Sequence, residues 1–142
     1  MKTNREILSS VLKTTQMGQL GIRSVLDAAV QSDLRQALNQ QLQEYDRIET
    51  EAHSIASQRG WELRELDPAV RFLSDRMTRM KLVGSNRDSR IADMMIQGNT
   101  RGLIQGIRGL HQYPSRDDRV SGISQKLLDC ETANIRQMQQ FL

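Results

Sequence analysis

Four glycines spaced along one predicted helix constrain the fold of this chain more than any other feature. They stand at intervals of four, four and three residues, on one helical face: Gly98, Gly102, Gly106 and Gly109. Each glycine costs a helix interior about 1 kcal/mol relative to alanine, so a helix that keeps four of them needs a compensating contact. Close approach of a neighbouring helix supplies one. We therefore expect a tightly packed helical bundle, with Gly18 and Gly21 of the first helix as the facing surface.

The composition also favours an all-α protein. The chain has 142 residues, which is enough for one domain (1–142) with its own core. Aromatic residues make up only 4%, whereas sheets rely on aromatic and β-branched residues. The chain has no apolar run near the ~18 residues of a membrane-spanning helix, and its first residues lack the order of a signal peptide. Its single cysteine, Cys130, excludes an intramolecular disulfide. We expect a cytoplasmic protein.

The net charge of +3 invites a nucleic-acid interpretation, but the distribution of charge argues against one. Basic residues alternate with acids, as in Arg87-Asp88-Ser89-Arg90, and no aromatic residues are interleaved for base stacking. Such alternation is typical of solvated helix faces. We expect neither a nucleic-acid partner nor a membrane partner.

The apolar periodicity predicts four long helices. The first covers residues 4–30, the second begins at Asp33 with Ser32 as N-cap and stops at Gly60, and the third covers 87–111. The fourth follows Ser115, a second predicted N-cap, and continues to the C-terminus. A short helix is predicted over residues 69–83, in the connection between the second and third helices.

The length of that connection leaves two topologies open. It can cross the length of the bundle, so that the second and third helices run parallel, which is the order of ferritin-like bundles. Alternatively, the short helix packs as a fifth element in plain up-and-down order. We favour the first: a ferritin-like four-helix bundle with a short extra helix in the crossover.

A ferritin-like bundle raises the question of a two-metal site. That site takes a Glu from each of two helices and a Glu-x-x-His pair from each of the other two. Here Glu49 and His53 are four residues apart instead of three, and the first helix has no carboxylate at mid-length. The complete motif is therefore absent. The candidates for a degenerate carboxylate site are Glu44, Asp93 and Glu131.

Several polar residues occupy positions where the helical pattern expects apolar ones: Thr14, Thr15, Gln41, Asn99, Glu131 and Asn134. If they lie at one level, they form a buried polar layer, which must be internally hydrogen-bonded to be tolerated. Such a layer either fixes the register of the helices or is a vestigial metal or small-ligand site centred on Glu131 and Glu44.

Residues 91–100 (Ile-Ala-Asp-Met-Met-Ile-Gln-Gly-Asn-Thr), followed by Gly102, resemble a segment of uncharacterised bacterial ferritin-like four-helix-bundle proteins. Similar features are Gln16-Met17-Gly18, Leu34-Arg35 with Gln41 and Glu44-Tyr45, residues 127–135 (Leu-Leu-Asp-Cys-Glu-Thr-Ala-Asn-Ile) and the ending Phe141-Leu142. The resemblance spans nearly the whole chain. It implies a ferritin-like fold and a bacterial cytoplasmic protein, and it carries no catalytic residues.

These observations lead to two functional hypotheses. The first is a non-enzymatic bundle that acts as a structural or protein-interaction module, without a cofactor and as a homo-dimer or other self-associated form. Its glycine face serves either the packing of the monomer or a two-fold interface, and a further protein partner is not identified. The alternative is a metal-binding or redox protein that holds iron or another divalent metal at the degenerate carboxylate site.

Overall fold

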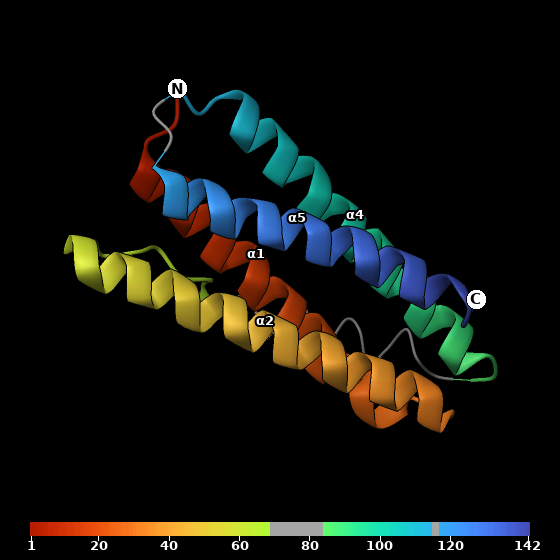
Figure 1. Cartoon of the computed structure of the whole chain (residues 1–142). Coiled ribbons are helices and arrows are strands. Elements are labelled where there is room, and N and C mark those ends of the chain that lie inside the picture. Colours follow the sequence, from red (N-terminus) through yellow and green to blue (C-terminus); the bar gives the residue numbers. More distant parts are fainter. Residues whose placement is uncertain (69–83, 115–116) are drawn as a thin grey trace.

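The computed structural model describes residues 1–68, 84–114 and 117–142. Within these ranges the protein is all-α. Its long helices are α1 (Asn4–Val25), α2 (Ser32–Arg59), α4 (Arg87–His111) and α5 (Asp118–Gln139), and a short 3-10 helix, η1 (Leu26–Ala28), extends α1. The helices lie side by side as two hairpins, α1 with α2 and α4 with α5 (Figure 1). No helix of the described ranges is long and apolar enough to cross a membrane.

Contacts at the two ends of the bundle set the helix directions. At one end, Asp88 in the first turn of α4 accepts hydrogen bonds from the backbone N–H groups of Val30 (2.7 Å) and Gln31 (2.9 Å), directly before α2. At the other end, the N–H of Asp117 donates to Asn4 Oδ1 (3.2 Å), so α5 begins beside the start of α1. Helices α2 and α4 therefore run in the same direction (Figure 1).

The first part of this connection follows α1. The N–H of Arg64 donates to Ser9 Oγ (3.2 Å), and the N–H of Leu66 donates to Gln16 Oε1 (2.8 Å). The chain thus starts back towards the end where α4 begins. The short helix predicted over residues 69–83 lies outside the described residues.

The helix ends differ from the sequence predictions where long-range contacts intervene. Helix α1 ends at Val25, earlier than predicted, because η1 and an extended turn lead into α2. Ser32 is the first residue of α2 and not its N-cap; the cap is Gln31, and the Asp88 carboxylate of α4 binds the N–H groups there. Ser115, the other predicted N-cap, lies outside the described residues, and Asp117 caps α5. The stop at Gly60 is confirmed by its left-handed conformation (φ 67°).

The core consists of apolar side chains from all four long helices. Leu8, Leu38, Ile91 and Ile123 are among the residues with no exposed surface. Among them lie ten buried polar residues of the described ranges, and these define the candidate site.

Candidate functional site

Three of the four glycines of α4 pack against neighbouring helices of the same chain. A Cβ atom at Gly102 would lie 3.1 Å from Thr14 Cγ2 of α1 and 3.3 Å from the Cδ of Glu131 in α5. At Gly106 it would lie 2.6 Å from Leu128 Cδ2, and at Gly109 it would lie 3.5 Å from Ile7 Cδ1. These glycines therefore serve the packing of the monomer, and a two-fold glycine interface would have to break that packing.

The predicted surface of facing glycines is wrong at Gly98 and Gly18, whereas Gly21 does face α4 but meets a side chain there and not a glycine. Gly98 is exposed, and no atom of the described ranges lies within 4 Å of a Cβ placed there. Gly18 faces α2, where its Cβ would lie 2.5 Å from Tyr45 Cζ, and Gly21 lies beside the Met95 side chain, 3.9 Å from its Cε atom. The reason is that side chains of α1 and α5, and not the glycines of α1, lie against Gly102, Gly106 and Gly109.

The space at Gly18 admits Tyr45 into the centre of the bundle. The Tyr45 side chain has no exposed surface, and its hydroxyl oxygen lies 3.0 Å from Asn99 Oδ1 of α4 and 3.0 Å from Glu131 Oε1 of α5. Asn134 Nδ2 donates to the same hydroxyl over 3.3 Å. We call Tyr45, Asn99, Glu131 and Asn134 the core cluster. It joins three of the four long helices, and Gly18 and Gly102 leave room for it.

Glu131 is the only acid of the core cluster, and it is 2% exposed. Burial raises its pKa from 4.5 to about 8, and the hydrogen bond from Tyr45 opposes this only in part. Burial and the neighbouring Glu131 likewise raise the pKa of Tyr45 well above 10.0. Both groups therefore favour their neutral forms at pH 7. Two atoms of the cluster, Glu131 Oε2 and Asn99 Nδ2, have no hydrogen-bond partner in the described ranges.

Cys130 borders the core cluster, where its surroundings disfavour the thiolate form. Burial, together with the nearby carboxyl groups of Glu131 and Glu44, raises the pKa of its thiol to about 12. Asn134 Nδ2 lies 3.6 Å from its Sγ atom. Because the thiolate is the reactive form, this raised pKa disfavours nucleophilic chemistry at Cys130 near pH 7.

The structure does not bring the three predicted metal candidates together. Glu44 forms an ion pair with Arg47 (3.0 Å), and Asp93 is exposed and accepts a hydrogen bond from Gln97 (2.8 Å). Only Glu131 is in the core. Across residues 1–68, 84–114 and 117–142, no three His, Cys, Asp or Glu side chains form a group that could hold a metal ion.

The observed polar layer contains fewer residues than the six that were predicted. Asn99, Glu131 and Asn134 meet, but Gln41 instead donates to Gln137 Oε1 (2.8 Å), and Thr15 donates to its own helix at Val11 O (2.7 Å). Helical periodicity puts Tyr45 among the apolar residues of α2, and it gives no indication that the tyrosine hydroxyl is the centre of the cluster. A buried tyrosine needs a partner for its hydroxyl, and that need is the signal that could have identified it.

A second polar group, also missed, holds α1 against α2. Gln16 Nε2 donates to Glu49 Oε2 and Glu65 Oε1 (both 3.3 Å), and Gln19 Nε2 donates to Asp46 Oδ1 (2.9 Å). Here two buried glutamine amides satisfy exposed or half-buried carboxylates. The role of this group is to attach the connection after α2 to α1.

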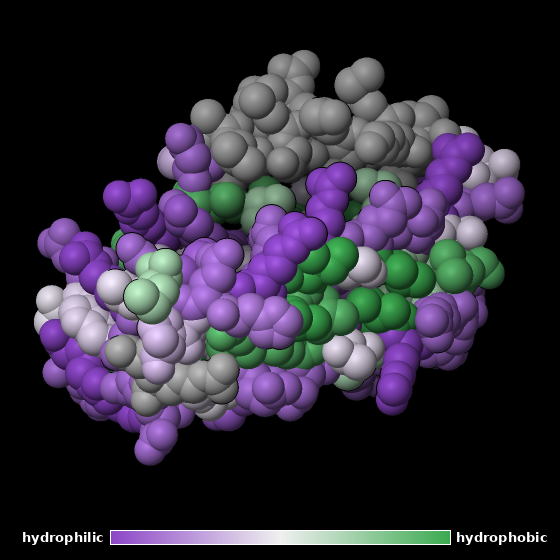
Figure 2. Space-filling view, turned by 90° about the horizontal axis from the view of Figure 1, so that it is seen from above, coloured by the Kyte–Doolittle hydropathy of each residue, from purple (hydrophilic) through white to green (hydrophobic). Residues whose placement is uncertain are grey.

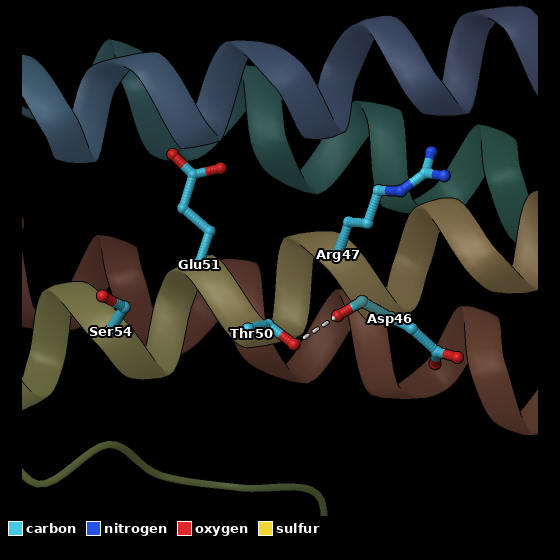
Figure 3. Close-up of a pocket in the computed structure, with 5 residues that line it drawn as sticks. All are labelled: Asp46, Arg47, Thr50, Glu51 and Ser54. Carbon is cyan, nitrogen blue, oxygen red and sulfur yellow. Dashed lines mark hydrogen bonds between the residues drawn. The ribbon is translucent and has the colours of Figure 1, made fainter.

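The outer side of α2 carries a shallow depression lined by five residues: Asp46, Arg47, Thr50, Glu51 and Ser54 (Figure 3). All five belong to one helix, and Arg47 and Glu51 point towards the α5 side of the bundle. Glu51 is bound there by Lys126 of α5 (3.0 Å), and Thr50 Oγ1 donates to the backbone of Asp46 (2.9 Å). These polar groups are thus engaged within the chain, and the depression has no converging groups from a second element.

Comparison of the chain with protein-family models, with curated proteins and with solved structures gives no match. The argument for function therefore rests on the geometry.

Proposed function

We propose that this chain is a non-enzymatic, ferritin-like helical bundle that serves as a protein-interaction module. The hairpin–crossover–hairpin order supports the ferritin-like assignment, because α2 and α4 run parallel as that order requires. The core cluster supports a structural interior: Tyr45, Asn99 and Asn134 surround Glu131 at the level where a metal-binding bundle needs several carboxylates.

The observation that carries the interaction role is the outer surface of α4. Ile104 and Ile107 are 44% and 40% exposed, an unusual exposure for two large apolar side chains on consecutive turns. Half-buried Leu103 continues the same flank, and Ile96 lies seven residues before it. Figure 2 shows a band of hydrophobic residues between polar borders on the face of the bundle that includes α4 and α5. A partner that covers this flank would remove that apolar surface from water.

The charges beside this flank indicate the chemistry of the partner. Arg101 and Arg108 lie one turn before and one turn after Ile104, and both are exposed. Neither forms an ion pair with another residue of the described chain. A partner helix or loop with apolar residues flanked by Asp or Glu would satisfy both features. In a two-fold contact between two α4 helices, Arg101 of one copy would face Arg108 of the other, and their repulsion disfavours that form of self-association.

The metal-binding or redox alternative rests on Glu131 and its unpartnered Oε2 atom. A divalent metal needs further ligands, and the described side chains around Glu131 offer the oxygens of one tyrosine and two asparagine residues. We place this function second, because its other two carboxylate candidates, Glu44 and Asp93, bind surface partners instead.

Site-specific photo-crosslinking in the native host tests the interaction role. A photoreactive residue at Ile107 should give a discrete crosslinked product, identified by mass spectrometry, whereas the same residue at exposed Thr50 of α2 should not. Combining the probe with Arg101→Glu and Arg108→Glu should reduce the product at least several-fold. A product composed of two copies of the 16.2 kDa chain would show self-association instead. Equal products at positions 107 and 50 would overturn the proposal.

A further inference from the structure

With Asn99 Oδ1 facing Tyr45, the hydrogen bonds around the tyrosine hydroxyl contain too few protons if Glu131 is ionised. The hydroxyl of Tyr45 has one proton, yet two acceptor oxygens, Asn99 Oδ1 and Glu131 Oε1, each lie 3.0 Å from its oxygen. The amide of Asn134 donates to the hydroxyl and so cannot supply either contact. With an ionised Glu131, one of the two oxygen–oxygen contacts would have no hydrogen atom between its members.

A proton on Glu131 Oε1 removes this deficit. Glu131 then donates to the Tyr45 oxygen, Tyr45 donates its own proton to Asn99 Oδ1, and Asn134 still donates to Tyr45. Each of the contacts has one hydrogen atom, and no charge remains among side chains that are between 0% and 6% exposed. A buried group that is neutral and hydrogen-bonded is far less costly than an isolated buried charge.

The groups that face Glu131 from each helix favour the neutral form of its carboxyl group. Helix α1 contributes Thr14 near Gly102, α4 contributes Gly102 and Asn99, and α2 contributes the Tyr45 hydroxyl. The titratable neighbours are acidic: Tyr45 of α2 and Cys130 of α5, with Glu44 of α2 acting on Cys130. No described lysine, arginine or histidine forms an ion pair with Glu131. Burial correspondingly raises the pKa of Glu131 to about 8.

We propose that Glu131 is a proton-binding site, in which the folded bundle holds a proton between Glu131 Oε1 and Tyr45 Oη. When this proton is lost as the pH rises, the contact of α5 with helices α2 and α4 weakens. The ligand is a proton, and the atoms that hold it come from α2 and α5. The central part of α5 is the element that responds to loss of the proton. This site is independent of the α4 surface to which we assign the interaction role.

A competing arrangement has Asn99 turned by 180° about its last side-chain bond. Its NH2 group would then donate to Tyr45, and Tyr45 would donate to an ionised Glu131. The two arrangements exchange the positions of the Asn99 amide oxygen and nitrogen, and they differ in the protonation state of Glu131, which can be measured.

The deciding experiment is a titration of the full chain labelled with 13C at the glutamate carboxyl carbons, followed by NMR. The Glu131 signal is assigned through its own backbone amide, so the assignment does not depend on whether a variant folds. A midpoint near pH 8 is expected. A midpoint in the range of ordinary glutamates, about pH 4–5, would overturn the proposal and favour the turned Asn99.

Hydrogen exchange provides a second readout that tests the coupling to α5. After correction for the intrinsic rates, the amides around Glu131 should exchange on the order of tenfold faster at pH 8.5 than at pH 6, because ionisation weakens the contacts of α5. Glu131→Gln should abolish this increase, whereas the matched control Asp129→Asn, at an exposed carboxylate that accepts from Gln125, should keep it. An increase of the same size in both variants would contradict the proposal.

Discussion

Replacing Glu131 by glutamine should make the protein more stable at alkaline pH, because glutamine keeps the shape of the protonated carboxyl group and cannot ionise. The pKa of Glu131 is raised from 4.5 to about 8 in the folded protein. The folded state therefore holds a proton over a range in which the unfolded chain has lost it. The sign follows: the free energy of unfolding decreases as the pH rises from about 4.5 to about 8, and above that it no longer changes on account of this group.

The magnitude follows from the same two values. Each pKa unit corresponds to about 1.4 kcal/mol, so the full decrease has an upper limit of about 5 kcal/mol. Between pH 5.5 and 8.5 the wild type should lose roughly 2–3 kcal/mol relative to Glu131→Gln, since an ionised group can relax towards water and thereby lower its cost.

Urea unfolding of the wild type, Glu131→Gln and the control Asp129→Asn at these two pH values measures this quantity. All other titrating groups are common to the three proteins, so their effects cancel in the differences. We expect the difference between Glu131→Gln and the wild type to grow with pH, and the difference for Asp129→Asn to stay within about 0.5 kcal/mol. A Glu131→Gln difference that is the same at pH 5.5 and 8.5 would refute the reasoning.

Further substitutions test the packing around the core cluster and the contact of Asp88 at the end of the bundle, with urea unfolding as the measurement. Gly18→Ala should destabilise by about 2–3 kcal/mol, because its Cβ would lie 2.5 Å from the Tyr45 ring, whereas Gly122→Ala, where no described atom lies within 4 Å, should stabilise by about 1 kcal/mol. Equal effects of these two would contradict the close contact. Gly102→Leu should destabilise by several kcal/mol, since even a Cβ there would lie 3.3 Å from the Glu131 carboxyl group, and a change within error would show an open site. Asp88→Asn should cost about 1–2 kcal/mol near pH 7. Partial burial raises the pKa of Asp88, but the Val30 and Gln31 N–H groups outweigh this and lower it below 3.8, so the wild-type advantage should disappear as the pH falls through that lowered value. An advantage that persists there would contradict the assignment.

The sequence predicts those parts of the fold that depend on local patterns. The bounds of α4, Arg87–His111, agree with the prediction, because a cluster of turn residues precedes the helix and Tyr113-Pro114 follows it. The Gly60 stop agrees as well, since a left-handed C-cap favours glycine. The N-cap at Ser32 fails because local cap preference says nothing of Asp88, more than fifty residues away, whose carboxylate binds the N–H groups before α2.

In the candidate site, too, local patterns predict some features, and features that depend on long-range contacts are not predicted. The inward positions of Asn99, Glu131 and Asn134 follow from helical periodicity, and the structure brings these three together. The role of their common partner, Tyr45, cannot be predicted from helical periodicity. In the sequence pattern, a tyrosine at a core position resembles any apolar residue until the position of its hydroxyl is known. The relation between Gly18 and Tyr45 depends on the relative positions of α1 and α2 and is likewise invisible in the spacing of the glycines.

We infer that the core cluster around Glu131 holds no metal ion, and metal analysis is the direct test. The full chain, purified without a metal-binding tag and loaded with ferrous iron under anaerobic conditions, is dialysed and analysed for iron, manganese, zinc and copper. The account predicts far less than one metal ion per chain and the same content in Glu131→Gln. Near-stoichiometric metal in the wild type that is lost in Glu131→Gln would contradict it and make the metal-binding function the leading one.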